Sequence, residues 1–152
     1  MAENHDYAVA VAILTPKGIV LVKRTSEELW VFPGGKGRSS ETSLTYYSPS
    51  DVLFREKRTA VEKVFAKTGI RLHEKELRTL HAENRVDHQF YLFAVEISAN
   101  PALKDRMGNK LIGGIFTPQK LRALTNFFPP HQALFLKYLA SIAPDEDIGE
   151  VG

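Results

Sequence analysis

The most constraining feature of this chain is an apolar run at residues 7–14, with the sequence YAVAVAIL. A strand with so little polar alternation is expected where both faces of its sheet are covered by other elements. A second apolar run of this kind lies at residues 89–97, and segments with helical patterns lie between the two runs and after them. This order predicts an α/β fold, an α/β/α sandwich with a mixed β-sheet.

The longest predicted helix covers residues 51–68, with Ser50 as its N-cap and Gly69 as its C-terminal stop. At 100° per residue its side chains divide into two sides. The apolar side carries Phe54, Val61, Val64 and Phe65, and the opposite, polar side carries Glu56, Thr59, Lys63 and Lys67. The other expected elements are a strand at 19–22, a loop at 33–50, a strand at 110–116 and helices at 118–124 and 130–142.

Composition narrows the class of protein. The 152 residues are 43% hydrophobic and 25% charged, which is typical of one globular domain, and we expect it to cover residues 1–144 with an acidic tail at 145–152. The net charge of +2 is spread along the chain, so a dedicated nucleic-acid binder is not expected.

The chain has no cysteine, which excludes disulfides and thiolate chemistry. No apolar run reaches roughly 18 residues and the N-terminus has no basic signal, so a cytoplasmic protein without a membrane segment is expected.

A glycine-rich segment and the helix after it carry the strongest functional signal. The segment WVFPGGKGRSSE at 30–41 is followed, after an interval, by AVEKVFAKTGI at 60–70. Together they resemble the box motif of the Nudix hydrolase superfamily. Gly35 and Glu41 keep the first spacing of that motif, Gly69 and Ile70 keep its end, and Val64 keeps an internal apolar position.

The resemblance implies a Nudix-like fold and a site for a nucleoside diphosphate-linked ligand. Gly34 and Gly35 would let the backbone approach a pyrophosphate closely, while Lys36 or Arg38 would compensate its charge. The helix of the motif normally carries carboxylates that hold Mg²⁺, which masks phosphate charge before water attacks. The loop glutamate, here Glu41, is implied as a central catalytic residue.

The helix departs from the motif at its ligand positions. Counting back from Gly69, the Arg-Glu pair of the family is Glu62-Lys63 here, and its Glu-Glu pair is Ala66-Lys67, so three metal-ligand glutamates are replaced. Aligning the Arg-Glu pair on Arg55-Glu56 instead would displace Gly69, so that register is rejected. In addition, 20 residues separate Glu41 from Glu62, where the family has seven.

Two interpretations of this changed helix remain open. Weak residual Mg²⁺ binding would use Glu41, Glu56 and Glu62, with Glu41 and Glu62 as the catalytic carboxylates. Lys63 and Lys67 belong either to a solvated helix face or to a site in which their ammonium groups replace cations and hold phosphates directly.

A general base is implied less clearly, and Glu83, Asp87 and His88 are the candidates.

Taken together, the resemblance and the replaced ligands predict a divergent Nudix-family protein that binds a nucleotide-like small molecule, with Mg²⁺-dependent pyrophosphate hydrolysis impaired or lost. The alternatives are an active hydrolase with a non-standard metal site and a non-catalytic protein-interaction module. Nudix domains often form dimers, so a homodimer is also open.

Overall fold

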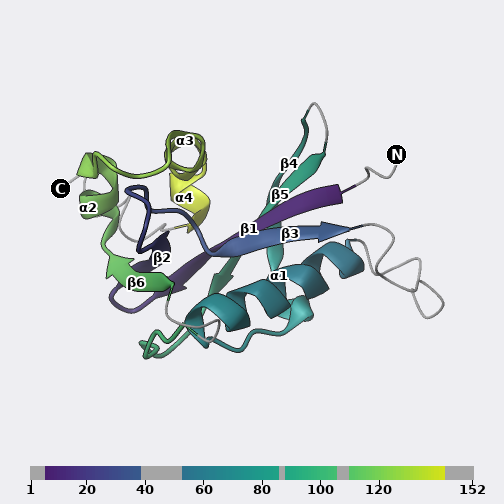
Figure 1. Ribbon diagram of the computed structural model, residues 1–152, viewed down its shortest axis with the longest axis horizontal. Helices are drawn as coiled ribbons and strands as arrows, with labels where there is room; N and C mark the ends of the chain where they lie inside the picture. Colours follow the sequence, from purple (N-terminus) through teal and green to yellow (C-terminus); the bar gives the residue numbers. More distant parts are fainter. Residues whose placement is uncertain (1–5, 39–52, 86–87, 106–109, 143–152) are drawn as a thin grey trace.

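The computed structural model describes residues 6–38, 53–85, 88–105 and 110–142. Within these ranges three strands are followed by a long helix and a short 3₁₀ helix, and three more strands are followed by three helices (Figure 1). The elements are β1 (Asp6–Thr15), β2 (Gly18–Arg24), β3 (Gly34–Arg38), α1 (Phe54–Thr68), the 3₁₀ helix η3 (Glu74–Glu76), β4 (Arg78–Asn84), β5 (Gln89–Glu96), β6 (Leu111–Phe116), α2 (Pro118–Ala123), α3 (Pro129–Lys137) and α4 (Leu139–Ile142).

The strands form one mixed sheet in the order β4-β5-β1-β2-β6, and β3 also pairs with β1. β1 and β5 are parallel, with Tyr7 opposite Gln89, whereas the other strand pairs are antiparallel. β1 is therefore the centre of the sheet, and its apolar side chains are covered on both faces as the sequence predicts.

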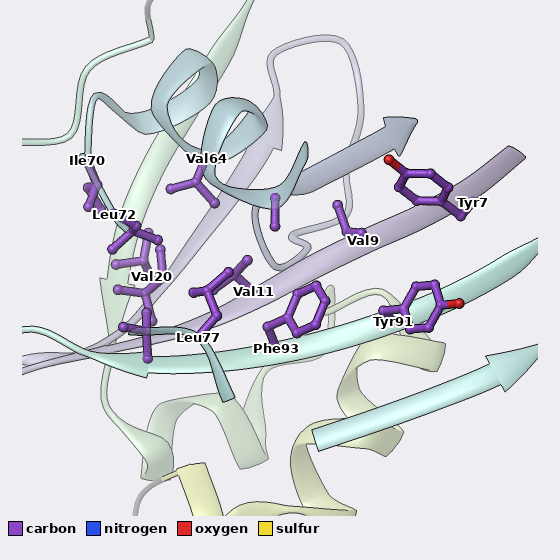
Figure 2. Packing of buried hydrophobic residues seen from close by; sticks show 13 residues of the cluster. Tyr7, Val9, Val11, Val20, Val64, Ile70, Leu72, Leu77, Tyr91 and Phe93 are labelled. Atoms are coloured by element: carbon purple, nitrogen blue, oxygen red, sulfur yellow. The ribbon is translucent and has the colours of Figure 1, made fainter. Parts of the chain in front are cut away.

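Helices cover both faces of the sheet. Figure 1 shows α1 on one side and α2, α3 and α4 on the other. Along β1, Val9 and Val11 belong to the core cluster under α1 (Figure 2), while Ala10 and Ala12 belong to the cluster under α2–α4. The predicted α/β/α sandwich with a mixed sheet is confirmed. None of the helices in the described ranges is long and apolar enough to span a membrane.

The prediction of a loop from residue 33 onwards is wrong at its start, because Gly34–Arg38 form strand β3. β3 runs antiparallel to β1, with Gly34 opposite Ala10. Glycine weakens a strand by its local propensity, but the backbone pairing with β1 outweighs that cost here. A Cβ atom at Gly34 would lie 2.0 Å from the Val9 carbonyl oxygen, so only glycine fits at this close approach.

Helix α1 begins later than predicted and ends where predicted. Its N-cap is Leu53, which has a positive φ of 60° and makes no side-chain cap hydrogen bond, whereas the expected cap Ser50 lies outside the described residues. Gly69 ends the helix with a φ of 80°, which glycine adopts without steric cost. The predicted helix at 130–142 is two helices, α3 and α4, because Tyr138 leaves the helical conformation at a φ of −109°.

The predicted division of α1 into an apolar and a polar side is also partly wrong. The fully buried positions are Glu56, Ala60, Val64 and Thr68, so the buried side includes a carboxylate. Part of the supposed polar side faces β3, which presents glycines and therefore leaves room for long side chains. The side chain of Lys63, for example, lies against Gly35, and the hydroxyl of Thr59 hydrogen-bonds the hydroxyl of Tyr7 on β1 at 2.6 Å. The alternative that this side of the helix is simply solvated does not hold.

Candidate functional site

Two lysines of α1 lie on the glycine strand β3. The Nζ atom of Lys67 donates a hydrogen bond to the carbonyl oxygen of Gly34 at 2.5 Å. The aliphatic part of Lys63 crosses Gly35 so closely that a Cβ there would lie 3.0 Å from both Cγ and Cδ of the lysine. The structure therefore brings together four of the predicted phosphate-binding residues, and Lys63 and Lys67 are only partly exposed.

The surroundings of Lys67 are positively charged. Burial lowers the pKa of the Lys67 ammonium below its usual value, and the charges of Arg24 and Lys63 lower this pKa further. Arg24 is the last residue of β2, so the cluster draws cations from two elements. In the described part of the chain, no ion pair joins Lys63 or Lys67 to a carboxylate. The cluster thus keeps an excess of positive charge that suits an anion.

The other predicted phosphate ligands point elsewhere or are incompletely described. Lys36 pairs with Ala8, whereas Gly35 pairs with Val9. Since successive strand residues face opposite sides of a sheet, Lys36 lies on the α2–α4 side and not with Lys63. Arg38 ends β3, and only its backbone belongs to the described structure.

Of the predicted metal ligands, the two that lie among the described residues, Glu56 and Glu62, are not brought together. Glu56 is 4% exposed, and its Oε2 atom is 3.0 Å from Nη2 of Arg55. Glu62 has a side chain that is 66% exposed and pairs with Arg58 at 3.6 Å. The two glutamates are about 120° apart around the helix, and Glu41 lies outside the described residues.

The described residues do not fit a magnesium site. Across the described ranges, no group of three or more His, Asp or Glu side chains could hold a metal ion. The Oε1 atom of Glu56 is buried without a hydrogen-bond partner among the same residues, so it is the one carboxylate atom at the start of α1 that could accept another group. A single carboxylate is far short of the oxygen ligands that Mg²⁺ needs.

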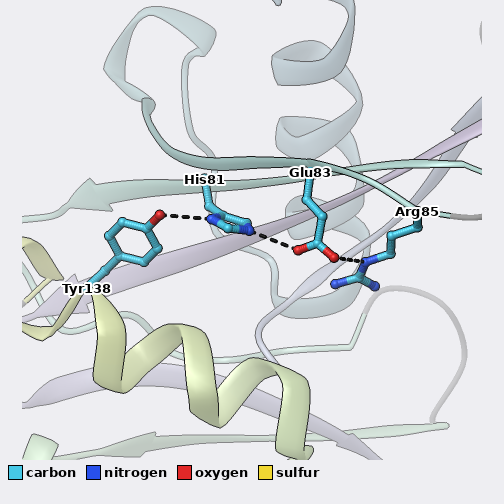
Figure 3. A network of polar contacts seen from close by, with 4 residues as sticks. All are labelled: His81, Glu83, Arg85 and Tyr138. Atoms are coloured by element: carbon cyan, nitrogen blue, oxygen red, sulfur yellow. Dashed lines mark hydrogen bonds and ion pairs between the residues drawn. The ribbon is translucent and has the colours of Figure 1, made fainter.

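Glu83, one of the predicted general bases, belongs to a network on the other side of the sheet (Figure 3). Its Oε1 atom is 2.9 Å from Nε2 of His81, and its Oε2 atom accepts from Nε of Arg85 at 3.0 Å. Nδ1 of His81 in turn lies 2.8 Å from the hydroxyl of Tyr138.

These contacts weaken Glu83 as a base. The hydrogen bond from His81 lowers the pKa of the Glu83 carboxyl, as does the one from Arg85. Glu83 also pairs with Phe90, whose side chain belongs to the core cluster under α2–α4, so it faces away from α1. Of the other two candidates, His88 is half-buried and Asp87 lies outside the described residues.

His131 is a residue whose role the sequence did not indicate. Its Nδ1 atom accepts a hydrogen bond from the backbone N–H of Phe32 at 3.1 Å, and its ring stacks on the Phe32 ring at 5.3 Å. Burial, and to a lesser degree the charge of Arg85, lower the pKa of His131 to about 4. Because Phe32 and Pro33 lead directly into Gly34, this contact positions the start of β3. The only sequence signal was a histidine in the first turn of a helix.

Comparisons with known proteins find similarity of structure alone. No family model and no curated protein sequence matches the chain. A MutT structure from work on Aliivibrio salmonicida and Vibrio cholerae is 20% identical, with a TM-score of 0.67 over 90% of this chain and 98% of that chain. A nudix hydrolase family member from Chromobacterium violaceum is 12% identical, with a TM-score of 0.62 over 99% of this chain and 90% of that one.

A third structure similar to this chain contains bound ligands. The bifunctional NMN adenylyltransferase/ADP ribose pyrophosphatase of Francisella tularensis, crystallised with AMP and a manganese ion, is 12% identical. Its TM-score is 0.62, and the likeness covers 93% of this chain but 43% of that longer one.

Proposed function

We propose that this chain, which has the Nudix fold, is a divergent member of that superfamily that binds a nucleoside diphosphate-linked ligand and has impaired or lost Mg²⁺-dependent hydrolysis. The observation that carries the proposal is the hydrogen bond from Lys67 to the carbonyl of Gly34. It holds an ammonium group against the glycine strand at a position where the box motif has a metal-binding glutamate.

Binding follows from the charges at this place. Lys63 and Lys67 are compact point charges on one helix face, and Arg24 adds a third cation nearby. Hydrogen bonds between ammonium groups and phosphate oxygens are strong because both partners are charged. The neighbouring Gly35 has no side chain, so a phosphate can approach the strand closely.

Loss of standard hydrolysis follows from the same residues. A lysine ammonium supplies charge, but it does not offer open coordination positions or lower the pKa of a bound water as a metal ion does. The cations at Lys63 and Lys67 would also repel Mg²⁺. The alternative of an active hydrolase depends on Glu41, which lies outside the described residues.

Ligand binding without Mg²⁺ is the first expected result. The purified protein would be incubated with nucleoside triphosphates, dinucleotides and nucleotide sugars, with Mg²⁺ or with a chelator, while thermal shift and product are both measured. At least one compound should raise Tm in the chelator without being consumed. In a Lys63→Gln, Lys67→Gln double variant its affinity should fall about tenfold per lost charged hydrogen bond.

The matched control changes two exposed lysines outside the cluster, Lys75→Gln with Lys120→Gln, and removes the same net charge. Equal losses in both double variants would mean that only overall charge matters. Turnover that needs Mg²⁺ and disappears in Glu41→Gln would overturn the proposal in favour of an active hydrolase.

Restoring the glutamates of the motif should restore dependence on metal. In the triple variant Lys63→Glu, Ala66→Glu and Lys67→Glu, a carboxylate replaces the ammonium that faces the Gly34 carbonyl. Two oxygen groups facing each other without a cation are destabilising, so Tm should fall in a chelator and recover with millimolar Mg²⁺. An unchanged response to Mg²⁺ would show that the alignment counted back from Gly69 is wrong.

A further inference from the structure

A cavity lies between the sheet and helix α4, on the opposite face of the sheet from α1. Its volume is about 380 Å³, and its lining residues come from β1, β4, β5 and α4. Small-molecule pockets in proteins commonly have volumes of about 300–1,000 Å³, so this cavity has room for a small ligand. It also lies at the carboxyl ends of the parallel strands β1 and β5, a place where open α/β sheets often bind ligands.

Three alanines leave this space open and make its wall apolar. Ala12 and Ala94 are register partners on β1 and β5, and both are buried. Ala140 of α4 lines the same cavity. Protein interiors are otherwise closely packed, and the methyl groups of these three residues are too short to fill the layer between the sheet and α4.

Two exposed side chains of opposite charge line the same cavity. Arg78 is the register partner of Ala94, and Glu96 follows Ala94 by two residues, so both side chains lie on this face of the sheet. The Cα atoms of such diagonal neighbours are roughly 7–8 Å apart. The Nη2 atom of Arg78 donates to the backbone carbonyl oxygen of Ser141 at 3.2 Å, which holds the guanidinium toward α4. Among the residues that the structure describes, no ion pair joins Arg78 to Glu96.

We propose that this cavity binds an aliphatic α-amino acid, whose carboxylate contacts Arg78, whose ammonium group contacts Glu96 and whose side chain packs against the alanines. The anion cluster of Lys63 and Lys67 lies on the α1 side of the sheet, so this second site does not depend on the proposed function.

The two charges select this class of ligand. A guanidinium has five N–H donors, and the contact with Ser141 uses Nη2, so donors remain for a carboxylate. Hydrogen bonds between charged partners are stronger than those between neutral ones. A simple carboxylic acid would be repelled by Glu96 and a simple amine by Arg78, whereas an amino acid carries a partner for each.

Three related compounds test the assignment. L-valine carries both charges, N-acetyl-L-valine lacks the ammonium group, and L-valinamide lacks the carboxylate. Affinities would be measured by calorimetry, and NMR spectra of the backbone amides would locate the site. L-valine should bind about tenfold more tightly than either derivative, because each derivative loses one charged hydrogen bond. The amide signals of Ala94 and Ser141 should shift, while those of Gly34 and Lys67 should stay in place.

Two charge variants serve as controls for each other. Arg78→Gln should remove the advantage of L-valine over L-valinamide and keep its advantage over N-acetyl-L-valine. Glu96→Gln should have the opposite effect. Ala140→Leu fills the cavity from the exposed side of α4 and should abolish binding. Ala123→Leu makes the same change at an exposed alanine of α2 and should leave binding unchanged.

L-leucine and L-phenylalanine would be measured beside L-valine, so that the size of the side chain is varied as well. Failure of all three amino acids to bind at millimolar concentration would overturn the inference. Equal affinity for L-valine and its two derivatives would also overturn it, since the apolar wall alone would then bind the ligand. Shifts centred on Gly34 and Lys67 would place the ligand elsewhere and overturn the assignment to this cavity. None of these compounds contains phosphate, so each of these results leaves the proposed function intact.

Discussion

Replacing Gly34 with alanine is expected to lower the free energy of unfolding by about 3 kcal/mol or more. The new Cβ atom would lie 2.0 Å from the carbonyl oxygen of Val9 and 2.8 Å from the Cα atom of Ala10. Both atoms belong to the backbone of the central strand β1, so neither can relieve the contact by a change of rotamer, as a side chain could. The strand β3 must separate from β1, and the Gly34 carbonyl must leave Lys67. Denaturant titration followed by circular dichroism would measure the loss.

Gly35→Ala is the matched control for this expectation. There the new Cβ atom would meet the Cγ and Cδ atoms of Lys63 at 3.0 Å, and these atoms belong to a flexible side chain that can move. The free energy of unfolding should fall by about 1 kcal/mol or less, while the affinity for phosphate compounds should fall because Lys63 is displaced. Similar losses of stability in both variants would contradict the claim that the approach of the Gly34 backbone to the β1 backbone is what excludes a side chain there.

The sequence predicts the sheet well where side chains carry the signal. The apolar runs of β1 and β5 indicate strands because their residues must be covered on both faces, and the structure places them in parallel at the centre of the sheet. β3 could not be predicted in this way, since Gly34, Gly35 and Gly37 have no side chains to form a pattern. Its pairing with β1 is a contact between distant segments, which local propensity does not contain.

The candidate site shows the same division between local and distant information. Alignment to the motif identifies Lys63 and Lys67 as replaced ligand positions, because that comparison depends only on spacing from Gly69. Helix periodicity alone assigns both lysines to a polar face. It contains no information about the space that the glycines of β3 leave beside the helix. Arg24 was missed for a similar reason, because only folding brings the end of β2 to Lys67.

His131 links the α2–α4 side of the sheet to the glycine strand, and this link should make the stability of the protein depend on pH. The folded state favours the neutral ring, because its Nδ1 atom accepts the Phe32 N–H. The pKa of His131 is about 4 in the folded protein, against about 6.5 in an unfolded chain. Between these values the unfolded chain binds the additional proton, so the free energy of unfolding falls as pH falls from about 6.5 to about 4.

The expected loss over this interval is about 3 kcal/mol, and the contribution of His131 is fully present above about pH 6.5. Denaturant titrations at several pH values would measure it, with His131→Gln as the test variant because glutamine keeps an acceptor but does not titrate. The variant should be less stable than the original protein at pH 7, because glutamine cannot stack on the Phe32 ring. On acidification it should lose less stability than the original protein does. Since Phe32 leads into Gly34, protonation of His131 should also weaken the anion site, so the affinity for phosphate compounds and the stability should decline together. A phosphate affinity that stays constant while stability falls would separate His131 from the glycine strand and contradict its positioning role.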